Sequence, residues 1–316
     1  MTLQRLSSPL NPVDALIVAF AFLLAIFCIF FAGIVHVWLS IIFINAVTGA
    51  AIIGLSYRAQ QGRSGFWRLL HDWYPVPVIF FSFKEMYIII QSFGTRDYDN
   101  LLIAIDHRMF GVHPTIWLTQ FASPLLTEVL QISYASFYFL MFAVGFEVFR
   151  RRSRADFAFV MFTFLYGFFL SYVGYLLIPA VGPRFTLHNF DTLNTELPGL
   201  CVTNFIRDFI NAGESIPRDV ANPIMYAQRD AFPSGHTEMT LLVMYLAARF
   251  RLKSRYALYT LGTLLIISTV YLRYHYVVDL VGGAAFMALT VSSGPTLIRW
   301  WKKIQSRIGA VSRARP

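Results

Sequence analysis

Apolar residues gather along the chain in long runs that short polar stretches separate. A helix needs roughly 20 apolar residues to cross the hydrocarbon core of a bilayer. Eight runs are candidates for such helices, and they cover residues 14–35, 38–57, 74–93, 124–148, 157–179, 236–250, 256–273 and 276–298. The sixth and seventh runs are short, which fits helices whose ends reach a polar cavity. The pattern predicts an all-α fold, a polytopic membrane helix bundle with about eight transmembrane helices.

Basic residues cluster at alternate ends of these predicted helices. Loops on the cytoplasmic side of a membrane carry an excess of lysine and arginine, so we expect these ends to lie in the cytoplasm. Both termini then lie there too, while the longer connections 94–123 and 180–235 lie on the other side. The clustered residues are Arg5, Arg58, Arg63, Arg68, Arg150, Arg151, Arg152, Arg154, Arg249, Arg251, Lys253, Arg255, Arg299, Lys302, Lys303, Arg307, Arg313 and Arg315.

The composition excludes two broad classes of protein. The chain is 57% hydrophobic and 14% charged, which is far more apolar than a soluble domain with a wettable surface. The formal net charge of +9 could suggest nucleic acid as a partner, but the basic residues fall in short clusters between apolar runs, so we expect no nucleic-acid binding. The sequence leaves the oligomeric state open.

Two segments on the non-cytoplasmic side have patterns of their own. Residues 98–121 mix apolar side chains with Asp106, His107 and Arg108, which is typical of an amphipathic segment that rests on the membrane surface. The alternative is a lid or an element that selects a lipid headgroup. Residues 181–229 form a long polar loop broken by prolines, and such a loop is usually either functional or disordered.

The hexapeptide Phe232 to Thr237 is polar and runs directly into an apolar helix. A turn with Ser234 and Gly235 before a helix leaves unpaired backbone N–H groups, which together with the helix dipole favour an anion such as phosphate. His236 stands at the edge of this turn. Because histidine titrates near working pH, it can protonate a leaving oxygen. The plainer alternative is a helix start with a serine cap and an interfacial histidine.

Three ionisable residues, Arg273, His275 and Asp279, crowd around the junction of the last two apolar runs. Such residues are costly within membrane spans and often mark function there. His275 and Asp279 are four residues apart, so they would share one face of a helix. Asp279 could then accept the Nδ1 proton of His275 and leave Nε2 free to attack phosphorus. The alternative is an interfacial salt bridge that anchors the helix.

The sequence Gly182-Pro183-Arg184 follows the fifth apolar run. A guanidinium can clamp phosphate oxygens with two hydrogen bonds, although an interfacial arginine can also simply extend its charge to the membrane surface. This turn, the hexapeptide and the His275 to Asp279 segment all fall on the extracytoplasmic side. Together they predict a phosphoryl-transfer site that faces away from the cytoplasm.

These three elements, in this order and spacing, resemble the signature motifs of the type 2 phosphatidic acid phosphatase superfamily of membrane enzymes. The resemblance covers residues 74–298 and implies a six-helix catalytic core there. Residues 1–73 would then be an N-terminal two-helix addition, and residues 299–316 would be a basic cytoplasmic tail.

The resemblance also implies roles for individual residues. His275 would be the nucleophile, Asp279 its orienting carboxylate, and His236 the general acid and later the base. The phosphate would be held by Arg184 and by the amides of Ser234 and Gly235. No metal and no cofactor is implied, because positive side chains and amides take the place of a metal.

Departures from the phosphatase pattern indicate which reaction to expect. Position 177 is Leu where the pattern has Lys, and Ser268-Thr269 stands where it has Ser-Arg, so two phosphate-binding cations are missing. Gly-Pro-Arg and the Tyr-Leu before the histidine look more like the inositol phosphorylceramide synthase branch, which passes phosphoinositol from phosphatidylinositol to ceramide. We therefore expect a headgroup transferase with a phospholipid substrate and a lipid hydroxyl acceptor. The alternatives are a lipid phosphate phosphatase, which acts on phosphatidic acid or prenyl pyrophosphate with water as acceptor, and a non-catalytic lipid transporter or scaffold.

Arg273 offers a replacement for one missing cation. It lies four residues after Thr269. Because helical side chains lean toward the N-terminus, an unbroken helix would place its guanidinium near the space of the lost arginine. Arg273 is therefore a further predicted phosphate-binding residue.

Three other charged residues have two interpretations each. Lys84 and Glu85 lie in the middle of the third apolar run, where they could bind a headgroup or an acceptor, or could pair with another helix. Glu238 could tune the acidity of His236 or cap the first turn of its helix.

Overall fold

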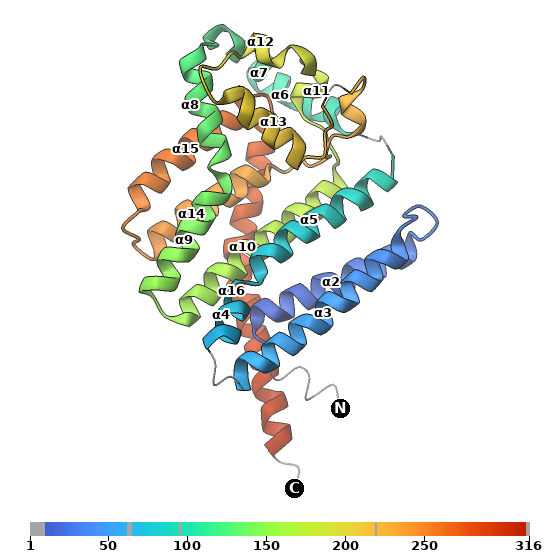
Figure 1. Cartoon of the computed structure of the whole chain (residues 1–316), viewed down its shortest axis with the longest axis vertical. Coiled ribbons are helices and arrows are strands. Elements are labelled where there is room, and N and C mark those ends of the chain that lie inside the picture. Colours follow the sequence, from blue (N-terminus) through green and yellow to red (C-terminus); the bar gives the residue numbers. More distant parts are fainter. Residues whose placement is uncertain (1–9, 62–64, 95–96, 219, 314–316) are drawn as a thin grey trace. The chain divides into compact units, whose positions relative to one another are not determined.

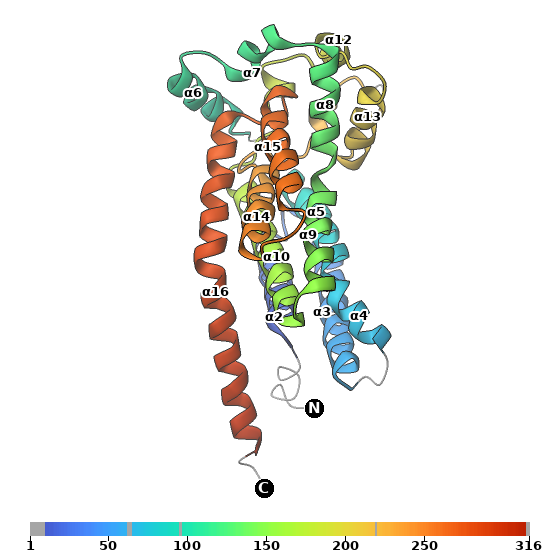
Figure 2. The ribbon, with the colours of Figure 1, turned by 90° about the vertical axis from the view of Figure 1, so that its left-hand side faces the viewer.

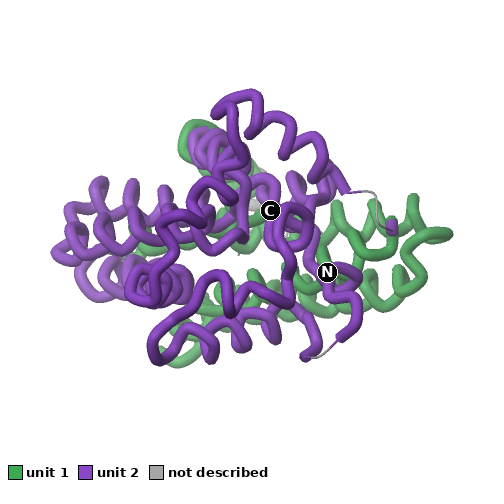
Figure 3. Tube along the Cα trace, turned by 90° about the horizontal axis from the view of Figure 1, so that it is seen from above, with its two compact units in different colours: residues 1–93, 154–169, 289–316 green, residues 94–153, 170–288 purple. Residues whose placement is uncertain are grey.

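The computed structural model describes residues 10–61, 65–94, 97–218 and 220–313, and the side chains up to residue 308 (Figure 1). Arg5, Arg63 and Arg315, and the side chain of Arg313, lie outside this described part. All the regular elements within it are helices, so the predicted all-α fold is confirmed. The chain divides into two compact units, which are 1–93, 154–169 and 289–316 for unit 1, and 94–153 and 170–288 for unit 2 (Figure 3).

Unit 1 contains four helices from the first part of the chain, α2 (Pro12–Phe30), α3 (Trp38–Gln61), α4 (Gly65–Trp73) and α5 (Pro75–Ser92). Asp14 in the first turn of α2 connects them, although it is fully buried. Its carboxylate accepts hydrogen bonds from Ser56 at 3.2 Å and from the Tyr74 hydroxyl at 2.6 Å, and it lies 3.1 Å from Nε2 of His71. A buried carboxylate with several partners is stabilised, whereas an unpaired one would be costly.

Glu85 on α5 also has a partner on another helix. Its carboxylate accepts a hydrogen bond from the Asn45 amide of α3 at 3.1 Å. Lys84 lies 5.9 Å from the centre of the Tyr87 ring. The Asn45 contact favours the structural interpretation of Glu85, a polar pair between two helices of unit 1.

Unit 2 contains the helices α8 (Pro124–Ala135), α9 (Phe137–Arg151), α14 (Gly235–Arg249) and α15 (Arg255–Tyr271). Five short helices, α6 (Asp99–Phe110), α7 (Pro114–Trp117), α11 (Pro183–Thr186), α12 (Leu193–Glu196) and α13 (Thr203–Gly213), gather at one end of this unit (Figures 1 and 2). Unit 2 also contains three 3₁₀ turns, which are Leu118–Phe121, Phe190–Thr192 and Pro223–Met225. The helices α10 (Arg154–Leu177) and α16 (Val277–Arg313) each contribute residues to both units.

Five helical segments of the described chain are long and apolar enough to cross a membrane, or six if the bent α8–α9 pair counts as one span. They are α2, α3, Gly65–Ser92, α10 and α16 as far as Ile308. The polytopic membrane bundle is therefore confirmed. The predicted sixth and seventh spans fold as α14, with 15 residues, and α15, with 17 residues, and both are shorter than the roughly 20 residues of a simple span. They are short because α14 begins at the Ser234 cap and α15 ends before Arg273, whose φ is 70°.

The long polar loop between residues 181 and 229 is folded, and one carboxylate organises its middle. Glu128 on α8 accepts N–H hydrogen bonds from Leu200 at 2.9 Å, from Cys201 at 3.1 Å and from Val202 at 2.7 Å. It also accepts the hydroxyl of Thr203, the first residue of α13, at 2.6 Å. A carboxylate at a helix N-terminus stabilises the helix, so Glu128 holds α13 against the end of α8.

Candidate active site

The three signature motifs meet within unit 2, where backbone hydrogen bonds join them in pairs. Each motif, or a residue one or two positions before it, shares a bond with both of the others, so their relative placement does not depend on side chains alone. The bonds run from Ala231 N–H to the Ala180 carbonyl at 3.0 Å, from Arg184 N–H to the Arg273 carbonyl at 3.0 Å, and from Ser234 N–H to the Asp279 carbonyl at 2.9 Å.

The two histidines face each other. Nε2 of His275 lies 3.4 Å from Nδ1 of His236. Nδ1 of His275 lies 2.9 Å from the Ala231 carbonyl, and because a carbonyl can only accept, Nδ1 carries the proton. Nε2 of the neutral ring then carries a lone pair, and this lone pair accepts the hydrogen bond from Nδ1 of His236. This is the arrangement of a nucleophile beside a general acid.

The ring of His275 is neutral at physiological pH. Burial lowers the pKa of His275 to about 4, although the Asp230 carboxylate and the Ala231 carbonyl act in the opposite direction. His275 is 4% exposed, so little water competes for its lone pair. The ring is therefore ready to act as a nucleophile without first losing a proton.

Asp279 lies beside His275, but not in the way that the spacing predicts. α16 begins at Val277, so the two residues do not share one helix face. Oδ2 of Asp279 lies 3.4 Å from Nδ1 of His275 and accepts the Tyr276 N–H at 2.8 Å. Oδ1 is buried and has no hydrogen-bond partner within the described residues. The closer acceptor of the Nδ1 proton is the backbone carbonyl of Ala231. The sequence does not reveal this acceptor, because every residue has a backbone carbonyl.

The Pro-Ser-Gly-His turn caps its helix, as the plainer of the two interpretations of this turn expects. The Ser234 hydroxyl accepts the Thr237 N–H at 3.2 Å, whereas the Ser234 N–H is already used by the Asp279 carbonyl. Gly235 has no room for a side chain, because a Cβ there would lie 2.2 Å from the Tyr175 hydroxyl. The binding of phosphate by the Ser234 and Gly235 amides stays a prediction, and for Ser234 it requires an exchange of hydrogen bonds.

Arg184 is buried next to the motifs, with 6% of its surface exposed. Its guanidinium forms an ion pair with Glu214 and donates to Asn211 at 3.4 Å. The preceding turn requires glycine, since Gly182 has a φ of 92° and a Cβ there would lie 2.6 Å from the Tyr274 carbonyl. The guanidinium thus has a carboxylate partner that the sequence did not suggest, and its binding of phosphate stays a prediction.

A stack of planar groups connects the His236 ring to the Arg184 guanidinium. The ring of Tyr134 on α8 lies 4.6 Å from the His236 ring and 4.2 Å from the Tyr274 ring, measured between centroids. The Arg184 guanidinium lies 4.6 Å from the centre of the Tyr274 ring. Contacts of this kind restrict the orientation of each group. Sequence reasoning missed Tyr134, since nothing distinguishes it from other aromatic residues in an apolar run.

Arg273 does not follow the helical geometry from which its role was predicted. α15 ends at Tyr271, and the left-handed backbone of Arg273 turns its side chain away from the line of the helix. The guanidinium forms an ion pair with Glu196 and donates to the Thr119 hydroxyl at 3.3 Å. The reason for the prediction is therefore wrong, and the phosphate-binding role of Arg273 stays untested.

Glu238 is fully buried on α14, two residues after His236. Its carboxylate accepts a hydrogen bond from the Ser171 hydroxyl of α10. This hydrogen bond links α14 to α10. It bears on neither of the two interpretations drawn from the sequence, the tuning of His236 or the capping of the helix.

Helix α6, part of the segment predicted to rest on the membrane, buries two carboxylates and exposes apolar side chains. Leu101 and Phe110 are exposed, whereas Asp99 and Asp106 are buried. Asp99 accepts N–H groups of Val181 at 3.0 Å and Gly182 at 2.9 Å. The exposed face agrees with a helix that rests on the membrane, and the buried face attaches to the first motif.

The same helix attaches to the third motif as well. Asp99 accepts the Tyr276 hydroxyl at 2.7 Å, and Asp106 accepts the N–H groups of Val277 and Val278, both at 2.8 Å. Asp106 thereby caps α16 two residues after His275, the predicted nucleophile. The spacing of Asp99 and Asp106 in the sequence could have indicated these positioning residues, because carboxylates seven residues apart share one face of a helix.

We expect Asp106→Ala to lower kcat for a phospholipid substrate by about tenfold or more, because small displacements of a nucleophile are costly. Asp106→Asn keeps one acceptor and should restore part of the rate. Both are measured with the full-length protein in detergent, with the thermal midpoint recorded alongside. His107→Ala, an exposed neighbour on α6, is the control. A kcat of Asp106→Ala equal to that of the wild-type protein would contradict the positioning role of Asp106.

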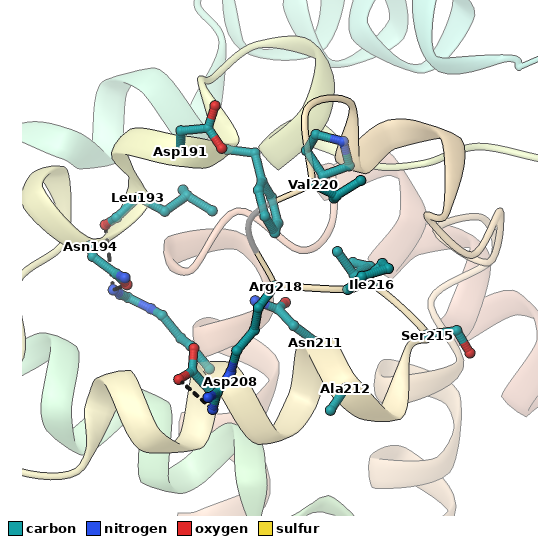
Figure 4. Close-up of a pocket in the computed structure, with 14 residues that line it drawn as sticks. Asp191, Leu193, Asn194, Asp208, Asn211, Ala212, Ser215, Ile216, Arg218 and Val220 are labelled. Carbon is teal, nitrogen blue, oxygen red and sulfur yellow. Dashed lines mark hydrogen bonds and ion pairs between the residues drawn. The ribbon is translucent and has the colours of Figure 1, made fainter.

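A cavity of about 680 Å³ lies beside Asn211, the hydrogen-bond partner of Arg184 (Figure 4). Its charged side chains balance, with two arginines and two aspartates, and Asp208 and Arg218 form an ion pair at 3.0 Å. None of the signature residues lines it. The lining residues are Phe190, Asp191, Leu193, Asn194, Arg207, Asp208, Asn211, Ala212, Ser215, Ile216, Pro217, Arg218, Val220 and Pro223.

Comparison with known proteins agrees with this geometry. No curated protein and no solved structure matches the chain. The family model of the PAP2 superfamily matches residues 100–292, which is more than half of the chain and includes all three motifs. A match of this extent, over the segment that holds the paired histidines, shows that the chain belongs to the PAP2 superfamily.

Proposed function

We propose that this chain is an integral-membrane lipid phosphotransferase that works through a covalent phosphohistidine at His275. Membership in the PAP2 superfamily supports an enzyme of the lipid phosphatase or phosphotransferase type. The observation that carries the proposal is the neutral His275 ring, with Nδ1 on the Ala231 carbonyl and Nε2 at 3.4 Å from His236. These contacts leave a lone pair on Nε2 and place a proton donor beside it.

In the first step Nε2 of His275 attacks the phosphorus of a phospholipid. His236 enters this step protonated, because the negative phosphate beside it favours the charged ring. The bond from phosphorus to the leaving lipid oxygen breaks, and His236 gives that oxygen its proton. The Asp279 carboxylate and the Ala231 carbonyl stabilise the positive charge that forms on the His275 ring. The product is a phosphorylated His275 and a lipid alcohol.

In the second step an acceptor hydroxyl replaces the histidine. His236, now neutral, takes the proton of the hydroxyl as its oxygen attacks phosphorus, and the phosphorus–nitrogen bond breaks. Negative charge spreads over the phosphoryl oxygens in both transition states, so positioning and positive charge carry most of the catalysis. We assign the stabilisation of this negative charge to Arg184 and to the Gly235 amide.

We assign the acceptor to a lipid hydroxyl, as in the inositol phosphorylceramide synthase branch. Leu177 and Thr269 replace two cations of the phosphatase pattern, and Arg184 shares its charge with Glu214. A phosphodiester carries less charge than a phosphate monoester and needs fewer cations. The balanced charge of the large cavity beside Asn211 fits an uncharged polar headgroup.

We further propose that both termini are cytoplasmic and that the site faces the extracytoplasmic side. The clusters of Lys and Arg at alternate helix ends support this orientation. The catalytic core would be 74–298, preceded by the addition 1–73 and followed by the basic tail 299–316. The family match at 100–292 lies within that core.

The test is whether the product depends on the acceptor. The full-length protein in detergent is given phosphatidylinositol labelled in its headgroup phosphate, with or without ceramide or a short-chain diacylglycerol, whose product differs in mass from the substrate. We expect labelled phosphate to appear on the acceptor lipid only when that lipid is present. Parallel reactions contain phosphatidic acid or prenyl pyrophosphate.

Release of the label to water at the same rate without acceptor, as inositol phosphate from phosphatidylinositol, or release of inorganic phosphate from phosphatidic acid, would favour the phosphatase alternative. Lipid binding without turnover of any substrate would favour the transporter or scaffold, and would contradict the enzymatic proposal.

A further inference from the structure

Two carboxylates lie in the site beside its one signature cation. Glu214, the residue directly after α13, forms the ion pair with Arg184. The guanidinium is about nine-tenths buried, and its Nε has no hydrogen-bond partner within the described residues. An incoming phosphate must therefore share or replace the Glu214 contact to reach Arg184, and part of the guanidinium remains available to it.

Asp230 is the second carboxylate, and the backbone around it is well held. Its neighbour Arg229 bonds to Asp97 at 2.6 Å, and its other neighbour Ala231 contacts both the Ala180 carbonyl and the His275 ring. The charge of Asp230 acts on His275, Arg184 and Glu214. Burial and the Glu214 carboxylate raise the pKa of Asp230 to about 6, so it is mainly ionised at neutral pH.

We propose that Glu214 and Asp230 make this site selective for the charge of its substrate, so that it takes phosphodiester lipids and discriminates against phosphate monoesters. The inference rests on the proposed phosphoryl transfer at His275. Near neutral pH a monoester carries a charge of about −1.5 to −2, whereas a diester carries −1. Each carboxylate repels the extra charge of the monoester, and Arg184 alone cannot compensate for both.

The size of the effect follows from Coulomb's law. Two unit charges several ångströms apart near a protein surface interact strongly enough to change an equilibrium constant by about tenfold or more. Removing one carboxylate should therefore favour a dianion over a monoanion by about tenfold. The substitutions Glu214→Gln and Asp230→Asn remove the charge and keep the shape of each side chain.

The first measurement is binding, which does not depend on turnover. Inorganic phosphate at pH 7.5 is the dianion probe and dimethyl phosphate is the monoanion probe. Binding is followed as ligand-induced thermal stabilisation of the full-length protein in detergent. We expect each variant to improve the affinity for phosphate about tenfold more than the affinity for dimethyl phosphate.

The second measurement is the ratio of kcat/KM for phosphatidic acid to kcat/KM for phosphatidylinositol. We expect this ratio to rise about tenfold in each variant and further in the double variant. Glu147→Gln is the matched control, because Glu147 lies at the end of α9, where it accepts the Lys253 N–H at 2.7 Å. That variant should keep the wild-type ratio.

Each outcome decides the inference. An equal gain in affinity for both probes would mean that the substitutions merely release Arg184, and it would overturn the proposed charge selection. Unchanged affinities and unchanged kcat/KM ratios would overturn it as well. If the wild-type protein turns over neither lipid, the proposed function fails. The binding measurement then still decides whether Glu214 and Asp230 select by charge.

Discussion

Replacing His275 with alanine is expected to abolish turnover of every phospholipid substrate, with a loss of kcat of at least about 10⁴-fold. The reason is that Nε2 of His275 forms the bond to phosphorus in the proposed reaction, and alanine has no atom that can form it. The measurement is single-turnover release of the lipid alcohol by full-length protein in detergent, with the thermal midpoint checked. Loss of the rate with an unchanged midpoint identifies a chemical role.

The control for this substitution is His107→Ala, which removes an exposed histidine of the same unit and should keep the rate. Retained turnover in His275→Ala would contradict the assignment.

The pH dependence of kcat/KM tests the protonation state of the His275 ring. Burial lowers the pKa of His275 to about 4, so Nε2 keeps its lone pair above that pH and gains a proton only below it. Activity should therefore fall as the pH decreases through about 4. Asp230, whose pKa is raised to about 6, has already gained its proton at that pH, so Asp230→Asn should leave this acid limb near 4. An acid limb near 6.5 would show that another group controls it.

Replacing His236 with alanine is expected to lower kcat for a phospholipid by about 10²-fold to 10⁴-fold. The leaving group of a phospholipid is an alkoxide, which needs a proton as the bond to phosphorus breaks. A phosphodiester with a p-nitrophenyl leaving group does not need that proton, so its first step should slow far less. The measurement is the burst of p-nitrophenol compared with the release of diacylglycerol under single-turnover conditions.

The comparison of leaving groups separates acid catalysis from simple damage to the site. The His236 ring also stacks on Tyr134, so its removal could disturb the stack that leads to Arg184. Such a disturbance would slow both substrates by the same factor. Equal losses would therefore contradict the role of His236 as general acid.

The sequence alone predicted the features that depend on neighbouring residues. Runs of apolar residues predicted the helices and the membrane class, because a bilayer requires about 20 such residues for each crossing. The Ser234 cap was predictable, since a serine before a helix accepts a nearby N–H, and Thr237 supplies it. The pairing of His236 and His275 followed from their chemistry and from the family resemblance.

Only the tertiary structure decided what surrounds these residues. Arg184 pairs with Glu214, 30 positions away, and Asp99 bonds to Tyr276, 177 positions away. No periodic pattern encodes such pairs, because they arise only when separate helices pack.

Arg273 shows the same limit within a short segment. Helical spacing from Thr269 predicted a guanidinium at the phosphate, yet a left-handed turn at Arg273 sends it to Glu196. A single backbone angle decides this direction, and most residues other than glycine adopt that angle only where the surrounding structure requires it. The sequence determined which chemical groups the site contains, and packing determined which of them carry charge next to the phosphate.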